Sequence, residues 1–303
     1  MKKDRVSKDN RFRLCVQALS FAFHNGYVRG FLTGKICTGA TKSICVPGLN
    51  CYSCPGASFS CPIGALSSVL GNRNFKFSLY VLGFLGLVGT FFGRLICGFI
   101  CPFGLISDLL YKIPLFKKEK NLPGHKYLKY LRYVTLILMV VLLPLLVLNS
   151  SGGGEPWFCE WICPDGTLLG GIPLTLLNPT LRSAIGGRFV MKVIILVGIL
   201  GLSVKYYRPF CKYLCPLGAF YGMFNPVATY KLKVDKDKCT DCGLCEKECL
   251  MGINVREKIN SPECIRCGKC KSVCPNGAIS ATFMGKTLSG GKNSELHSDT
   301  GKK

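Results

Sequence analysis

The sequence predicts an α-helical integral membrane protein of about four transmembrane helices, internally duplicated, followed by a small C-terminal α+β domain. Uncharged stretches recur along the 303 residues, of which 49% are apolar. Lys and Arg number 39 against 16 acidic residues, and they gather in some connections between the stretches and avoid others. Twenty cysteines recur at fixed spacings, in a chain too long for a small secreted disulfide scaffold. Together these patterns indicate a membrane protein with many thiolate ligands.

Four of the uncharged stretches approach the length of a membrane span, which is about 20 residues. The predicted spans are residues 12–32, 75–96, 129–149 and 188–205. A surface amphipathic helix is the alternative for the first, because His24, Asn25 and Arg29 crowd its end. Residues 166–181 are also uncharged but contain several Gly and Pro residues, which favours a broken or re-entrant segment over a fifth span.

The distribution of basic residues predicts the orientation in the membrane. Residues 94–132 carry eight basic and two acidic side chains, whereas residues 150–187 carry one Arg and three acids. Because Lys and Arg accumulate on the cytoplasmic side, we expect a multi-pass protein of the cell membrane with both termini and the C-terminal domain in the cytoplasm. Since topology accounts for most of the net charge of +23, no nucleic-acid partner is expected.

The C-terminal region has the most specific motif, a C-x2-C-x2-C-x3-C run that occurs twice, as CTDCGLCEKEC and CIRCGKCKSVCP. A [4Fe–4S] cluster needs four thiolates, and in such runs the fourth Cys serves the other cluster. The predicted ligands of one cluster are Cys239, Cys242, Cys245 and Cys274. Those of the other are Cys264, Cys267, Cys270 and Cys249. Zinc is the alternative, disfavoured because two complete four-Cys runs contain no His.

This segment resembles the two-cluster bacterial ferredoxins over about residues 232–285. The resemblance implies two [4Fe–4S] clusters and one-electron transfer at low potential. We therefore divide the chain into a membrane domain (1–230), a two-cluster ferredoxin domain (231–285) and a polar disordered tail (286–303).

A second motif, C-x3-C-P-x-G, occurs beside the predicted spans as CGFICPFG and, 114 residues later, as CKYLCPLG. Because C-x3-C on a helical turn places two thiols on one side, we expect a further cluster at the inner membrane face, with two ligands from each half. Its predicted ligands are Cys97, Cys101, Cys211 and Cys215. Packed, inert thiols are the alternative.

Related Cys–Pro sequences, CYSCPGASFSCPIG and WFCEWICPDG, are predicted to lie on the outer side. They offer five candidate ligands, of which four would bind a fourth cluster: Cys51, Cys54, Cys61, Cys159 and Cys163. The sequence does not choose among them, and a disulfide is the alternative. Such doubling places sites at the interface of the repeats. Cys15, Cys37 and Cys45 are predicted to be ordinary buried or loop cysteines.

Taken together, residues 75–285 resemble the membrane polyferredoxins, such as the quinol-dehydrogenase membrane subunits of periplasmic nitrate reductase systems and the membrane part of nitrous-oxide reductase regulators. The resemblance implies an anaerobic membrane-bound iron–sulfur protein that relays single electrons between a cytoplasmic or quinone-pool donor and a partner oxidoreductase. We expect a component of a larger oxidoreductase rather than a stand-alone enzyme, with no catalytic residues of its own. Quinone is a further candidate ligand, with Asp108 as a proton acceptor or, alternatively, a solvated interface acid.

An alternative function from another class uses the same cysteines. An assembly or maturation factor would deliver metal, clusters or reducing equivalents to a client enzyme. Retention or loss of the clusters on mixing with an apo-client distinguishes the two functions.

Overall fold

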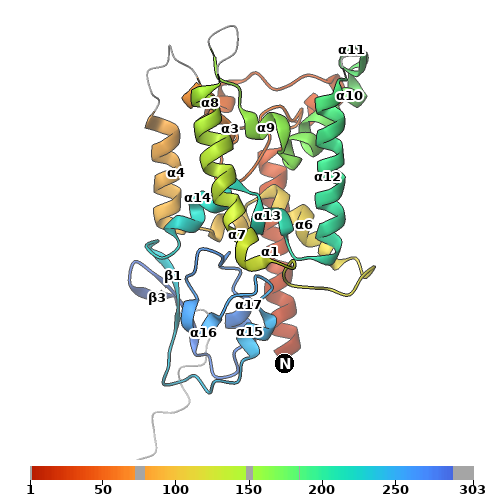
Figure 1. The fold of residues 1–303 in the computed structure, drawn as a ribbon. Coiled ribbons are helices and arrows are strands. Elements are labelled where there is room, and N and C mark those ends of the chain that lie inside the picture. The colour runs from red at the N-terminus through yellow and green to blue at the C-terminus, as the bar shows by residue number, and fades with distance from the viewer. Residues whose placement is uncertain (1, 72–78, 148–152, 184, 289–303) are drawn as a thin grey trace, which may run out of the picture.

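A helical bundle lies above a small mixed domain in the computed structural model of this protein (Figure 1). The structure describes residues 2–71, 79–147, 153–183 and 185–288, with side chains from residue 7 onward. The bundle is built on long helices that run roughly parallel (Figure 1): α1 (Lys2–His24), α4 (Leu79–Phe92), α12 (Gly187–Lys205), and α7 (His125–Val134) continued by the π-helix η2 (Thr135–Leu142) and by α8 (Leu143–Leu146).

Two helices of the described residues are long and apolar enough to cross a membrane, not the four predicted. They are His125–Leu146, with 22 residues, and Gly187–Lys205, with 19. The first predicted span is wrong in its limits, because α1 begins at Lys2, packs beside the lower domain through its charged half and ends at His24. Helix α4 has only 14 residues, and residues 75–78 of the second predicted span lie outside the described residues.

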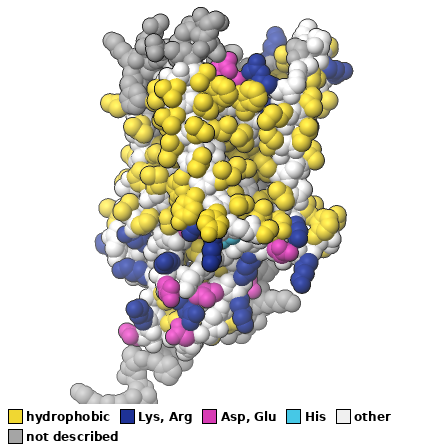
Figure 2. Space-filling view, viewed as in Figure 1, with side chains coloured by type: hydrophobic (Ala, Val, Ile, Leu, Met, Phe, Trp, Pro, Cys, Tyr) yellow, Lys and Arg dark blue, Asp and Glu magenta, His cyan; other side chains and the backbone are white. Residues whose placement is uncertain are grey.

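The bundle exposes a broad face of hydrophobic side chains, and Lys and Arg side chains gather below it (Figure 2). Leu87 of α4, Ile137 of η2, and Ile194 and Val197 of α12 are each more than half exposed. In water, a contiguous apolar surface of this kind is unfavourable and marks an interaction site.

Short helices fill the space between the long ones. In the lower half of the bundle these are α5 (Leu95–Phe99), α6 (Pro102–Lys112), α13 (Pro209–Tyr213) and α14 (Pro216–Phe224). The N-terminal segment and the connection after residue 152 contribute α2 (Val28–Thr33), the 3₁₀ turn η1 (Ala40–Ser43), α3 (Pro62–Gly71), α9 (Trp157–Trp161), the π-helix η3 (Gly166–Gly171), α10 (Ile172–Leu177) and α11 (Pro179–Ser183). Elements η3 and α10 together are too short to form a fifth span.

The lower domain combines three short helices with a small antiparallel sheet of strand order β1-β2-β3. Its elements are β1 (Tyr230–Val234), α15 (Leu244–Glu248), α16 (Val255–Lys258), α17 (Lys269–Val273), β2 (Ile279–Phe283) and β3 (Lys286–Leu288). Leu232, Val255 and Ile279 belong to its own small core. Strand β3 takes in residues 286–288, which the sequence assigned to the tail, and residues 289–303 lie outside the described residues.

Candidate metal centres

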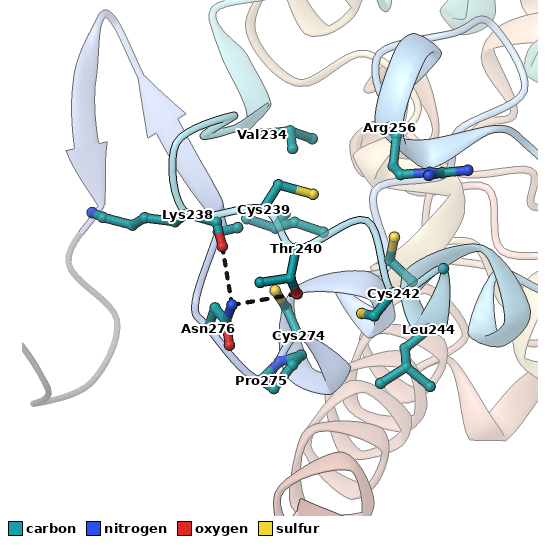
Figure 3. Close-up of a pocket in the computed structure, with 14 residues that line it drawn as sticks. Val234, Lys238, Cys239, Thr240, Cys242, Leu244, Arg256, Cys274, Pro275 and Asn276 are labelled. Carbon is teal, nitrogen blue, oxygen red and sulfur yellow. Dashed lines mark hydrogen bonds between the residues drawn. The ribbon is translucent and has the colours of Figure 1, made fainter.

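Four thiols of the lower domain line one cavity, which we call the distal site (Figure 3). They are Cys239, Cys242, Cys245 and Cys274. Asn276 holds the two parts of the site together, because its Nδ2 donates to the Lys238 carbonyl at 3.2 Å and to Thr240 Oγ1 at 3.4 Å. The chain reverses tightly between the ligands, since Asp241 and Gly243 both have positive φ, 49° and 68°.

Four other thiols line a second cavity in the same domain, the proximal site. They are Cys249, Cys264, Cys267 and Cys270. The loop repeats the geometry of the first, with positive φ at Arg266 and Gly268. Each cavity thus receives three cysteines from one run and the fourth from the other, the grouping that the spacing predicts.

The inner site lies in the bundle, where α5 and α13 are each followed by a Cys–Pro sequence. Its four thiols, all buried, are Cys97, Cys101, Cys211 and Cys215. Burial raises the pKa of the Cys215 thiol well above its usual value, and the neighbouring thiols of Cys211, Cys97 and Cys101 raise it further. The two halves of the chain therefore bring their thiols to one place.

The outer site is formed by four of the five predicted cysteines around a cavity of about 600 Å³. Cys51, Cys61, Cys159 and Cys163 line it. The fifth candidate, Cys54, does not line this cavity, and its Sγ donates instead to Asn25 Oδ1 at 3.5 Å. Of the cysteines predicted to be ordinary, Cys45 is buried and Cys15 is exposed. The structure thus makes a choice that the irregular spacing left open.

A shared C-P-x-G sequence builds both bundle sites. In the four copies of the bundle the Cys directly precedes a helix whose first residue is Pro, a position where the missing N–H costs nothing. The Gly three residues after the Cys donates its N–H to the sulfur, at 3.3 Å for Gly218 and Cys215 and at 3.4 Å for Gly166 and Cys163. Each of these thiols is therefore held at the positive end of a helix dipole, which favours a negatively charged ligand.

Asp165 occupies the x position of one copy and distinguishes the outer site from the inner one. The other three copies have Ile63, Phe103 and Leu217 there, all fully buried, and Asp165 is just as buried. Neither of its carboxylate oxygens accepts a well-aligned hydrogen bond from the described residues. Burial raises its pKa to about 8, opposed by the backbone N–H of Cys51. A buried carboxyl without an ion-pair partner therefore lines the outer cavity.

Asp108 is neither a solvated interface acid nor free to accept a proton, so both predictions for it are wrong. Its carboxylate is buried and accepts two hydrogen bonds from Arg208, at 2.8 and 2.6 Å, and lies 3.0 Å from Arg13 Nη2. Burial alone would raise the pKa of Asp108, but Arg208 and Arg13 hold it below its usual value. Sequence reasoning missed this because the three residues are about 100 positions apart.

The donor sets fit iron–sulfur clusters. Each site presents four thiols, and Cys₄ ligation is the usual arrangement for [4Fe–4S] clusters. In the part of the chain that the structure describes, no three His, Cys, Asp or Glu side chains are close enough to share one metal ion. A cubane does not require this, because each thiolate binds a different iron. When bound, a cluster would supply one-electron redox chemistry.

Comparisons with known proteins support iron–sulfur binding. A family model described as a 4Fe-4S binding domain matches residues 77–123, 131–173 and 189–234. Each match contains one C-x3-C-P motif. Another model, also described as a 4Fe-4S binding domain, matches residues 257–280, which include the second ferredoxin-type run. No solved structure matches the chain.

Among curated proteins, the chain is 39% identical over 203 residues to the uncharacterized protein MJ0750 of Methanocaldococcus jannaschii, covering 65% of this chain and 75% of that protein. It is 27% identical over 168 residues to the methylamine utilization ferredoxin-type protein MauN of Paracoccus denitrificans, covering 54% of this chain and only about half, 52%, of MauN. A 49-residue segment, 16% of this chain, is 39% identical to 14% of the putative electron transport protein YccM of Escherichia coli.

Proposed function

We propose that this chain, which belongs to the same family as the uncharacterized protein MJ0750, is a membrane-bound iron–sulfur protein that relays single electrons through four [4Fe–4S] clusters. The likeness to MauN and YccM supports electron transfer. The distal and proximal sites would face the cytoplasm, and the inner and outer sites would lie in a multi-pass membrane domain. The redox partner would be another protein. Quinone remains a candidate ligand, although no contact among the described residues supports a quinone site.

The observation that carries the proposal is direct contact between successive sites. Gly98, between the two inner cysteines of the first copy, lies so close to the proximal loop that a Cβ there would be 2.5 Å from the Ile265 carbonyl oxygen. In the other half, Lys212 Nζ donates at 3.0 Å to the carbonyl of Leu250, the residue directly after Cys249 of the proximal site. One close backbone approach and one side-chain hydrogen bond therefore join the inner and proximal sites directly.

The inner and outer sites are also close, which differs from the expectation of sites at opposite membrane faces. A Cβ on Gly48 would lie 3.3 Å from the Cα of Cys101, and Cys51 of the outer site follows three residues later. Three residues of extended chain reach about 10 Å at most. The physical reason is that the N-terminal loop folds into the bundle and carries Cys51 toward the inner site.

Tyr221 is a buried residue near both of these sites. Its ring is fully buried, and its hydroxyl donates to the Pro47 carbonyl at 3.0 Å. Burial, then the thiols of Cys97 and Cys61, raise the pKa of its hydroxyl well above the usual value. These thiols belong to the inner and the outer site respectively. A buried aromatic side chain near both sites supports electron transfer between them.

Iron and sulfide analysis with spin quantitation of the fully reduced protein, purified without oxygen, tests the proposal. We expect four clusters in the wild-type protein, three in Cys211→Ser and three in Cys163→Ser, with the two ferredoxin-type signals intact in both variants. Cys15→Ser is the matched control and should keep four. Two clusters in the wild-type protein, or bound zinc in place of iron, would refute the four-cluster relay.

A transfer assay separates the relay from a delivery function. The cluster-loaded protein is mixed with an apo-ferredoxin and the two are separated again. A relay keeps its iron and shows reversible reduction, whereas an assembly factor would lose one cluster to the acceptor.

A further inference from the structure

The repeated inner motif extends to an arginine that the sequence analysis did not include. Arg94 and Arg208 each precede the first Cys of their copy by three residues, so the repeat reads R-x2-C-x3-C-P-x-G. Both side chains are fully buried. Arg94 Nη2 donates to the Cys211 carbonyl at 2.9 Å, and Arg208 Nη1 donates to the Cys97 carbonyl at 2.5 Å. Each half therefore places its guanidinium on the first ligand of the other half.

The last Gly of each motif makes room for this crossed pair of arginines. A Cβ on Gly104 would lie 3.1 Å from Arg208 Nη1, and a Cβ on Gly218 would lie 3.1 Å from Arg94 Nη2. The guanidinium groups thus pack against the helix starts that follow the second Cys of each copy. The repeated motif therefore supplies both the thiols of the inner site and the positive charge beside them.

Only one of the two arginines is matched by a carboxylate. Arg208 is paired with Asp108, which also binds Arg13. Arg94 donates instead to carbonyls, including that of Pro262 at 2.9 Å, and its Nε has no partner. Among the residues described, no carboxylate pairs with Arg94. Three buried guanidinium groups and one carboxylate leave a net positive charge beside the inner site.

The outer site has a smaller surplus of positive charge. The charged residues that line its cavity are Lys192, Glu160 and Asp165. Lys192 donates to the Cys159 carbonyl at 3.1 Å, the contact that corresponds to the arginine contacts of the inner site. Glu160 is also paired with Arg188, at 3.4 Å. Even with Asp165 neutral, the outer site therefore has only one cationic group in excess of its carboxylates, whereas the inner site has two.

On the premise that both bundle sites hold clusters, which is part of the proposed function, we infer that the crossed arginines make the inner site the more easily reduced of the two. Four thiolates around a cubane carry net negative charge, and reduction adds one more. Buried positive charge stabilises that addition strongly because screening is weak in the interior. One electron leaving the reduced outer site enters the oxidised inner site, and the step needs no proton and no further reactant.

Opposite substitutions test this inference in the full-length protein by redox titration followed by EPR. The inner and outer signals are assigned by their loss in Cys211→Ser and Cys163→Ser. Arg94→Gln keeps hydrogen-bond donors but removes charge, and should make reduction of the inner site at least tenfold less favourable, about 59 mV for one electron. Asp108→Asn removes the opposing charge and should move the same potential upward. Both variants should leave the distal signal unchanged.

Arg94→Lys, which keeps the charge, covers the case in which Arg94→Gln fails to assemble its inner cluster. An inner potential close to that of the wild type in Arg94→Lys, with the upward shift in Asp108→Asn, would support the inference. It is overturned if the wild-type outer site has the higher potential, or if the inner potential fails to move in opposite directions in the charge-removing variants. If the wild-type protein holds four clusters, either of these results refutes the charge inference but not the relay. A wild-type protein with only two clusters would refute both the relay and the charge inference.

Discussion

The inner and outer sites use the same local device in different surroundings. Both hold thiols at the start of Pro-initiated helices, with a Gly N–H on the sulfur. Around the inner site the x positions are Phe103 and Leu217, and buried arginines supply charge. At the outer site one x position is Asp165, and the cavity is large. The difference shows that a four-thiol cage is set by short motifs, while its redox character depends on what the rest of the chain packs beside it.

The largest effect should come from removing one thiol of each bundle site. Cys101→Ser and Cys61→Ser should each abolish one cluster signal and lower the iron content by about a quarter. Because the inner site lies between the proximal and outer sites, only Cys101→Ser should also stop the transfer of electrons from the ferredoxin-type domain into the bundle. Stopped-flow reduction at low temperature measures this. Equal loss of transfer in both variants would contradict the order of sites.

A steric change at the contact between domains should have the next largest effect. In Gly98→Val the new side chain would meet the Ile265 carbonyl, so the proximal loop must move away. We expect at least tenfold slower electron transfer to the inner site with all four clusters retained. Gly83→Val is the control, because a Cβ there has nothing within 4 Å. An unchanged rate in Gly98→Val would show that electrons do not cross this contact.

Exchanging the residue that distinguishes the two sites should alter stability. Asp165→Leu copies the residue of the inner site and removes a buried carboxyl without partners, a group that costs about 1–3 kcal/mol. The free energy of unfolding of the cluster-free protein in detergent should rise by that amount, measured by denaturant titration. Asp165→Asn, which stays polar, should gain little. A loss of stability in Asp165→Leu would mean that the carboxyl has a partner in the protein in solution.

The smallest effect is expected from a change at Tyr221, near both the inner and the outer site. Tyr221→Phe removes one buried hydrogen bond to the Pro47 carbonyl, which contributes about 1 kcal/mol. The same denaturant titration should detect this loss, while the exposed control Tyr130→Phe should change nothing measurable. A change of several kcal/mol would indicate that the hydroxyl organises more of the N-terminal loop than this one contact.

The lower domain was the easier part to predict, because its ligands come from two runs that are close in sequence and the motif spacing assigns each Cys to a cavity. The predicted spans were less accurate. Charge-free length alone does not reveal that α1 lies partly beside the lower domain, or that α4 is only 14 residues long. The length of each helix depends on where tertiary packing ends it, and a hydropathy profile does not contain this information.

By itself the sequence determined the mostly helical architecture and the small C-terminal domain with its two four-cysteine runs, because these follow from hydropathy and short motif spacings. Only the tertiary structure decided which four outer cysteines share a cavity, that Asp108 is bound between Arg13 and Arg208, and that Arg94 and Arg208 cross between the halves. Those contacts join residues about 100 positions apart or more. Their energy depends on burial and distance in the folded chain, and a single sequence contains neither quantity.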